Sequence, residues 1–457
     1  MQLAEAQQAG SGKPRARVVA ASAGRAAAAA AGLAVFLAAL AGCGNTYRPV
    51  VAAINPVGPA GQPQKYAVAI SSPSATANGL VTLVDFSGDT VLVTATLGVN
   101  PYYFILNANG TTGYTLNSDK TVNSFDVSTS LITSQVLETT LLPGANPVSV
   151  FPSTSSTYIS DPGLGQIDQL TGTPPALKQE LPVAANPVYV VGVSGTPRAY
   201  AISQGTGSGA GQVAAIETGG NTVSATLPVG RGPVYGVMTN GAQRAFILNQ
   251  TDGTVTVINA VSNALDTPVT TIPVGVRPVW ADLAPTRNEL VVANEGTGTS
   301  TGSVSIVSIP LCSATALPAN PLCDAANPVD ATGFGTVLAT VPVGVNPIMV
   351  SVLSDGTRAY VANAGVAGLP CAAAAVAGVS TTCTVSVVNL TSNTVTATIP
   401  IAGHPAYLAT SSATPTGKVY VVCKDSQAMT VIETDTDSVD TTIPLQGNGV
   451  SVRVTQP

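Results

Sequence analysis

Residues 233–275 read PVYGVMTNGAQRAFILNQTDGTVTVINAVSNALDTPVTTIPVG. Four short runs, apolar or alternating apolar and polar, lie in this segment: Val234 to Met238, Arg244 to Leu248, Thr254 to Ile258 and Val269 to Val274. Two of the gaps contain Asn240-Gly241 and Asp252-Gly253, dipeptides that favour the tight turns of β-hairpins. The segment therefore predicts four short strands joined by hairpin turns.

This segment is one copy of a repeat whose start is marked by a proline. The marking prolines are Pro101, Pro147, Pro187, Pro233, Pro278, Pro347 and Pro405, and their spacings are 46, 40, 46, 45, 69 and 58 residues. The two long spacings each contain a pair of cysteines, so they represent a normal unit with an insertion. A period of about 40–50 residues with four strands per unit is typical of a β-propeller blade.

The repeat count predicts an all-β propeller of eight four-stranded blades, formed by residues 66–457. Seven complete units run from Pro101 to Asn448, three strand-like runs precede them between Tyr66 and Leu97, and one follows from Val450 to Val454. Because closing the ring removes free sheet edges, we expect these terminal runs to form one composite blade, with the C-terminal strand innermost. Seven blades is the alternative, if the terminal runs do not join.

The composition excludes several other classes of protein. Charged residues make up 9% of the 457 residues and hydrophobic residues 45%, which argues against a disordered chain. With 17 basic and 23 acidic residues, the chain lacks the positive charge that nucleic-acid binding needs, so no nucleic acid is expected as a partner.

One copy of the repeat has a recognisable motif. Asp355-Gly356-Thr357-Arg358-Ala359-Tyr360-Val361-Ala362-Asn363, followed by Thr384 to Asn389, resembles the YVTN-type propeller repeat. The resemblance covers nearly all of residues 66–454 and implies the propeller fold. Its relatives include binding proteins, surface-layer components and lactonase-like enzymes, and no catalytic pattern of theirs transfers to this chain residue by residue.

The N-terminal region predicts export. A leader with Lys13, Arg15, Arg17 and Arg25 precedes sixteen uncharged residues, Ala26 to Ala41, a length that suits a signal peptide. The following Leu40-Ala41-Gly42-Cys43 resembles the bacterial lipobox, which implies cleavage before Cys43 and its lipidation. We therefore expect a lipoprotein signal peptide at 1–42 and a lipidated, Pro-rich tether at 43–65, with the protein held at a membrane in the periplasm or on the cell surface. The alternative is a plain secretory peptide with an incidental cysteine.

Four cysteines predict two local disulfides, Cys312–Cys323 and Cys371–Cys383, in insertions near 310–335 and 365–383. Disulfides of this kind fit an oxidising compartment. No cofactor and no metal are expected, because the cysteines lack C-x-x-C spacing and have no histidine beside them in the sequence. Cys423 lies in a strand-like apolar run and is expected to be buried as a small hydrophobic residue.

The second residue after the marking proline is enriched in aromatic side chains: Tyr103, Tyr189, Tyr235, Trp280 and Tyr407. If the proline begins the innermost strand, these rings surround one end of the central channel and could bind a sugar, a peptide or another flat ligand. The alternative is that they only pack between blades.

The residue before the proline is Asn in five of the eight units, whereas Arg277 and His404 are exceptions. Pre-proline sterics predict an extended backbone at this position. Arg277 and His404 could belong to a polar ring near the aromatic residues, or could serve only the structure of the loops.

These features favour an exported, lipid-anchored binding or scaffold protein of the cell envelope, with an envelope protein, peptide or glycan as partner. Catalysis is not expected. The alternatives are a lactonase-like hydrolase at the channel mouth, for which Asp282 and His404 are the candidate residues, and a self-assembling surface layer.

Overall fold

The computed structural model describes residues 65–261, 265–312, 323, 328–371, 382–411 and 417–455. The predicted signal peptide, Cys43 and nearly all of the predicted tether lie outside these residues, as does much of both cysteine-containing insertions. Within the described part of the chain, no helix is both long and apolar enough to cross a bilayer.

The strands form eight four-stranded antiparallel sheets. The first four sheets that are continuous in sequence consist of β4 (Pro101–Leu106), β5 (Thr112–Asn117), β6 (Thr121–Asp126) and β7 (Leu137–Thr140); β8 (Ser149–Pro152), β9 (Thr157–Asp161), β10 (Gln166–Thr171) and β11 (Ala176–Pro182); β12 (Pro187–Gly192), β13 (Arg198–Ser203), β14 (Ala210–Glu217) and β15 (Thr222–Arg231); and β16 (Pro233–Met238), β17 (Arg244–Asn249), β18 (Thr254–Asn259) and β19 (Thr267–Pro273).

The next three sheets consist of β20 (Pro278–Ala284), β21 (Glu289–Asn294), β22 (Thr301–Ser308) and β23 (Val337–Val345); β24 (Pro347–Val352), β25 (Arg358–Asn363), β26 (Thr384–Asn389) and β27 (Thr394–Pro400); and β28 (Pro405–Thr410), β29 (Lys418–Cys423), β30 (Ala428–Glu433) and β31 (Ser438–Pro444). Among the described residues, two 3-10 helices, η2 (Thr129–Ile132) and η4 (Pro285–Arg287), lie in connections.

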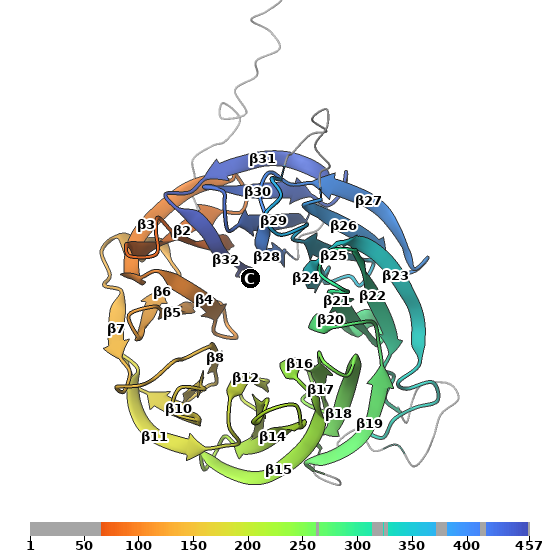
Figure 1. Cartoon of the computed structure of the whole chain (residues 1–457). Helices are drawn as coiled ribbons and strands as arrows, with labels where there is room; N and C mark the ends of the chain where they lie inside the picture. The colour runs from red at the N-terminus through yellow and green to blue at the C-terminus, as the bar shows by residue number, and fades with distance from the viewer. Residues whose placement is uncertain are drawn as a thin grey trace, which may run out of the picture. The chain divides into compact units, whose positions relative to one another are not determined.

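The eighth sheet joins the two ends of the ring. Its order is β3 (Thr90–Val99), β2 (Asn78–Asp85), β1 (Tyr66–Ser72) and β32 (Asn448–Val454), with Ala67 paired to Val454 and Ala69 to Val452. Each innermost strand contacts the innermost strands of both neighbouring blades, so the ring is closed (Figure 1). The prediction of eight blades with a composite blade is confirmed.

The core lies between the blades, because both faces of each sheet are covered. One apolar cluster, for example, combines Val291 and Val304 of one blade with Val350 and Val361 of the next, all fully buried. Burying a side chain of this size contributes about 1.5–3 kcal/mol. The middle strands of a blade are therefore buried on both faces, as seen in β17, which is buried along its whole length, whereas outermost strands such as β19 are largely exposed.

Polar side chains near the outer edges also tie neighbouring blades together. In four of the blades the second strand carries a buried tyrosine whose hydroxyl donates to an Asp or Asn in the outermost hairpin turn of the next blade: Tyr158 to Asn221, Tyr200 to Asp266, Tyr360 to Asp437 and Tyr420 to Asp89. In three of these blades the residue two positions before the tyrosine is basic and pairs with the same carboxylate: Arg198, Arg358 and Lys418. This contact explains why the Arg358-Ala359-Tyr360 pattern recurs.

Both predicted disulfides are confirmed. The Cα atoms are 5.7 Å apart in Cys312–Cys323 and 5.5 Å apart in Cys371–Cys383. The first lies in the connection between β22 and β23 and the second in that between β25 and β26. Cys423 is a buried free cysteine at the end of β29, as the sequence predicts.

Candidate functional site in the central channel

The inner strands share a local distortion that sets which side chains face the channel. In six of them the pairing register shifts just after the proline, between Pro233 and Tyr235 for example, as a β-bulge requires. Beyond the bulge the strand is regular, so the second and fourth residues after the proline point to the same side. The third residue points away and is buried, as Ala281 and Val350 show.

The predicted aromatic residues form a continuous series of contacts around the channel. The ring centroids of Tyr189 and Tyr235 are 4.7 Å apart, and those of Tyr235 and Trp280 are stacked at 4.1 Å. Tyr407 meets Trp280 edge-on at 5.6 Å. These four rings come from four inner strands (β12, β16, β20 and β28), so the repeat position brings them together.

Tyr103 on β4 extends this series on its other side. Its hydroxyl donates to the carbonyl oxygen of Val150 at 3.4 Å. Burial raises the pKa of Tyr103 well above its ordinary value, and the neighbouring Tyr189 raises it further. The phenols therefore remain neutral hydrogen-bonding groups at physiological pH.

A single arginine lies among these rings. The guanidinium of Arg453, on β32, is 4.4 Å from the ring centroid of Tyr407, a cation–π geometry. Burial opposes the charged form, but Tyr407, Tyr103, Tyr189 and Tyr235 outweigh this effect and raise the pKa of Arg453. Its Nε is buried and has no hydrogen-bond partner among the described residues. Arg453 is thus a cation with spare donor capacity in the channel.

Asp282 supplies the opposite charge. Its Oδ1 accepts the backbone N–H of Leu283 and its Oδ2 that of Val352, both at 2.8 Å. Burial raises the pKa of Asp282 to about 6, although these two hydrogen bonds and the charge of Arg453 lower it in part. Asp282 therefore changes its charge within the physiological pH range.

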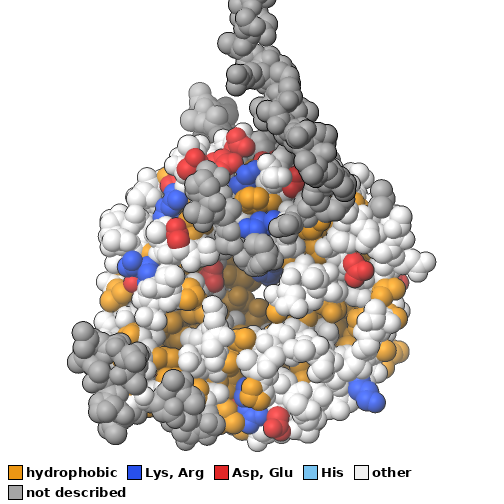
Figure 2. Space-filling view, turned by 180° about the vertical axis from the view of Figure 1, so that it is seen from behind, with side chains coloured by type: hydrophobic (Ala, Val, Ile, Leu, Met, Phe, Trp, Pro, Cys, Tyr) orange, Lys and Arg blue, Asp and Glu red, His pale blue; other side chains and the backbone are white. Residues whose placement is uncertain are grey.

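Two adjoining cavities open at the end of the channel where the inner strands finish. The larger, of about 620 Å³, is lined by Asp282, Ser351, Thr410 and Arg453 together with apolar residues. The smaller, of about 270 Å³, is lined by Tyr189 and Tyr235, and Val237 and Met238 border both. One face of the ring shows a central hollow walled mainly by hydrophobic side chains (Figure 2).

Sequence reasoning did not select Arg453, and it noted Asp282 only as a candidate of the enzyme alternative. Both occupy the fourth position after the proline or its equivalent, where the series reads Ile105, Phe151, Val191, Val237, Asp282, Ser351, Ala409 and Arg453. Two charged residues at a position that is small or apolar in the other six units are a signal. It could have been found by comparing the units at the fourth residue after the proline as well as at the second.

At five of the seven marking prolines the residue before the proline is left-handed instead of extended, so the prediction is wrong there; Gly232, with φ 61°, is one of the five, and Asn146 and His404 are the two exceptions. Asn100, Asn186, Arg277 and Asn346 have positive φ values of 44°, 58°, 57° and 56°. This left-handed conformation turns the local carbonyl groups toward the next loop: Asn346 O accepts the N–H of Ala364 at 2.9 Å and Val345 O that of Gly365 at 3.0 Å. Asn predominates here because it tolerates the left-handed region better than other non-glycine residues.

Arg277 and His404 lie in these loops, and neither is among the residues that line the two cavities. Arg277 pairs with Glu295 at 2.8 Å and is half-exposed. The Nδ1 of His404 is 2.6 Å from the Oδ2 of Asp425. The structure thus brings the five aromatic residues together, with Tyr189 and Tyr235 lining the smaller cavity and Tyr103, Trp280 and Tyr407 lining neither. Arg277 and His404 lie apart from both cavities.

Comparison with known proteins shows the fold alone. No family model and no curated protein matches the chain. Among solved structures, the dihydro-heme d1 dehydrogenase NirN superposes with a TM-score of 0.58 at 12% identity, covering 88% of this chain and 78% of that one. Apo AztD from Citrobacter koseri gives 0.55 at 11% identity, covering 85% and 97%. A putative 6-phosphogluconolactonase from Bacteroides fragilis gives 0.51 at 13% identity, covering 87% and 100%.

Proposed function

We propose that this protein is an exported, lipid-anchored binding protein of the YVTN-propeller type, which holds a small anionic ligand with a flat ring in its central channel. The observation that carries the proposal is Arg453. Its Nε is buried and has no hydrogen-bond partner among the described residues, and its guanidinium lies among tyrosine hydroxyls and aromatic rings. A carboxylate or similar anion would accept from the free Nε–H of Arg453, and a sugar or aromatic ring would contact Tyr189 and Tyr235, which line the smaller cavity and form an aromatic collar with Trp280.

The size and lining of the site support binding of a small molecule. A cavity of about 620 Å³ lies within the range of ligand pockets, and its wall mixes apolar side chains with many polar ones. Ser351 and Thr410, whose hydroxyl oxygens are 2.9 Å apart, add hydrogen-bonding groups to the same wall.

The location rests on separate support. Two disulfide pairs suit an oxidising compartment outside the cytoplasm. The lipobox-like Leu40 to Cys43 supports the proposed lipid anchor, through which the protein would be held at a membrane. The proposed partner at the channel is an envelope peptide, protein or glycan that carries the anionic group.

A lactonase-like hydrolase is the second candidate, and Asp282 favours it. A carboxylate with a pKa of about 6 beside a cation has the properties of a general base. Against it, both oxygens of Asp282 already accept backbone N–H groups, which fits a role in holding the wall of the cavity.

Trp280 is the only tryptophan in the chain and stacks on Tyr235, which lines the smaller cavity, so its fluorescence reports on changes at that residue. The purified soluble domain is titrated with glucuronate and benzoate, and with glucose and benzyl alcohol as their neutral counterparts. We expect at least one anion to change the Trp280 emission in a saturable way, its neutral counterpart to have little effect, and Arg453→Gln to weaken binding by about 10-fold or more.

The Arg277→Gln variant, which removes a charge outside the cavities, serves as the matched control and should bind normally. If no anion changes the emission, or if Arg453→Gln and Arg277→Gln behave alike, the channel site is rejected. Turnover of a lactone such as gluconolactone, lost in Asp282→Asn, would favour the hydrolase instead.

A further inference from the structure

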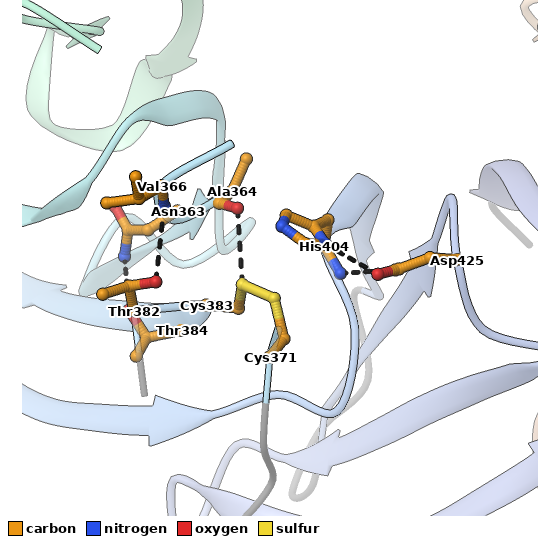
Figure 3. Close-up of a disulfide and its surroundings, with 9 residues drawn as sticks. All are labelled: Asn363, Ala364, Val366, Cys371, Thr382, Cys383, Thr384, His404 and Asp425. Atoms are coloured by element: carbon orange, nitrogen blue, oxygen red, sulfur yellow. Dashed lines mark hydrogen bonds and ion pairs between the residues drawn. A yellow bond between two sulfur atoms is a disulfide. The ribbon is translucent and has the colours of Figure 1, made fainter. Parts of the chain in front are cut away.

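The chain's only histidine lies between a carboxylate and a disulfide. His404 faces Asp425 through Nδ1, while Cys371 and Cys383 lie on its other side (Figure 3). The ligand atoms of Cys371, Cys383 and His404 are all within 4.8 Å of one another. The sequence gives no hint of this, because His404 is 21 residues beyond Cys383 and in another blade.

The orientation of His404 leaves one ring nitrogen available. Asp425 accepts both the backbone N–H of His404 and the proton on Nδ1, each at 2.6 Å. With Nδ1 protonated, Nε2 carries a lone pair. Nε2 is buried and has no hydrogen-bond partner among the described residues, which is an unusual state for a buried acceptor.

The sulfur atoms are held in place by the backbone around them. Cys383 is fully buried, and its Sγ lies 3.4 Å from the carbonyl oxygen of Ala364. Gly365 has φ +72°, and a Cβ at this position would come within 2.7 Å of the same Sγ. The backbone at Gly365 therefore lies so close to the Sγ of Cys383 that only glycine fits there.

We infer that, once the Cys371–Cys383 disulfide is reduced, the two thiolates and Nε2 of His404 form a binding site for a thiophilic divalent cation, Zn²⁺. Two sulfur ligands and one imidazole suit Zn²⁺, and they leave a fourth position open to water. Asp425 completes a carboxylate–histidine–metal arrangement, which fixes the ring and strengthens the histidine as a ligand.

The redox step balances with a small dithiol as the reductant. Thiol–disulfide exchange transfers two electrons and two protons to the protein, giving two Cys–SH groups and the oxidised, cyclic disulfide of the reductant. Binding of Zn²⁺ then forms two Zn–S bonds and releases the two protons. A disulfide oxidant reverses the process: it takes up two electrons, the Cys371–Cys383 bond re-forms and Zn²⁺ is released. Oxidation state thereby controls metal occupancy.

The second disulfide provides an internal comparison. Cys312–Cys323 closes a loop of similar length, with a separation of 11 residues against 12, but it has no histidine because His404 is the only one. Reduction of this pair should not create a comparable site.

The test measures Zn²⁺ binding by competition with a chromogenic chelator, using the intact propeller under anaerobic conditions. We expect the oxidised protein to retain no Zn²⁺ and the dithiol-reduced protein to retain one equivalent. Co²⁺ should give thiolate-to-metal charge-transfer absorbance in the reduced protein only. His404→Ala should lose most of the affinity, and Asp425→Asn should lower it by about 10–100-fold.

Two double variants show whether Zn²⁺ binds at this site or at any reduced cysteine pair of the chain. The Cys371→Ser/Cys383→Ser variant should retain no Zn²⁺ after reduction, whereas Cys312→Ser/Cys323→Ser should bind as the parent does, with circular dichroism showing that each variant remains folded. The inference is overturned if reduced parent protein binds no more Zn²⁺ than Cys371→Ser/Cys383→Ser, or if His404→Ala leaves the affinity unchanged.

Discussion

Tyr360 donates its phenolic proton to the Oδ1 of Asp437 over 2.5 Å, and this hydrogen bond joins two neighbouring blades. Arg358 contacts the same carboxylate through Nη1 at 2.8 Å. Asp437 has a positive φ of 49°, so the tight outer turn that presents the carboxylate is itself a strained position. The contact therefore combines a recurring turn with a recurring motif, and it links adjacent sheets.

Removing the acceptor of this contact should destabilise the ring. Asp437→Ala leaves both the buried part of Arg358 and the Tyr360 hydroxyl without their partner, and we expect a loss of about 2–3 kcal/mol in the free energy of unfolding. Tyr360→Phe removes one neutral donor and should cost about 1 kcal/mol. Guanidinium denaturation followed by circular dichroism measures both.

Asp435→Asn, at an exposed position in the same turn, is the matched control and should stay within about 0.5 kcal/mol of the parent. Equal effects of Asp437→Ala and Asp435→Asn would show that the inter-blade contact does not contribute to stability.

The fold could be predicted from the sequence because the information is repeated. Seven of the eight units carry the same proline, and all units repeat short strands joined by turns, so a unit that departs from the pattern is recognised by comparison with the others. The composite blade followed from the unpaired terminal runs and the cost of free sheet edges. The left-handed residue before the proline was missed, since pre-proline sterics alone predict an extended backbone and only the loop-to-loop hydrogen bonds of Asn346 and its equivalents reverse that preference.

The candidate sites were less accessible because they depend on residues that break the repeat. The aromatic collar was found, since Tyr189, Tyr235 and Trp280 share one repeat position. Arg453 was overlooked because the comparison of the units stopped at the second position after the proline, and Arg453 occupies the equivalent of the fourth. The closeness of His404 to Cys383 depends on the packing of one blade's insertion against the next blade's loop, and no spacing in the sequence encodes it.

The positive φ of Asn346 leads to a prediction that separates backbone strain from side-chain contacts. Asn346→Gly should be as stable as the parent or slightly more so, because glycine adopts φ +56° without a steric penalty. Asn346→Ala should be about 1 kcal/mol less stable than Asn346→Gly. Thermal unfolding of the two variants side by side checks this order, and an alanine variant as stable as the glycine variant would contradict it.

The proposed lipid anchor leads to a prediction about membrane association. In a bacterial host, the parent protein should partition into the detergent-rich phase and fractionate with membranes, whereas Cys43→Ser should be found in the soluble fraction. Mass spectrometry of the mature N-terminus should show acyl chains on Cys43. A Cys423→Ser variant, which leaves the leader intact, should remain with the membrane. Recovery of Cys43→Ser in the membrane fraction would favour another mode of attachment.

The raised pKa of Asp282 predicts how stability depends on pH. The carboxyl titrates near its ordinary value of 3.8 when the chain is unfolded and at about 6 when folded, because burial disfavours the charged form. Between these two values the folded state binds more protons than the unfolded state, so this group's contribution to stability falls as pH rises through the folded pKa.

Asp282→Asn has no such titration. The free energy of unfolding of the parent relative to Asp282→Asn should therefore increase as pH falls from about 7 to about 4. The partial exposure of the carboxylate in the channel limits the change to on the order of 1 kcal/mol. Denaturation of the two proteins across this pH range isolates the effect, since all other carboxylates titrate in both. A difference that is constant with pH, or that grows as pH rises, would mean that Asp282 is not held in the environment described for it beside Arg453.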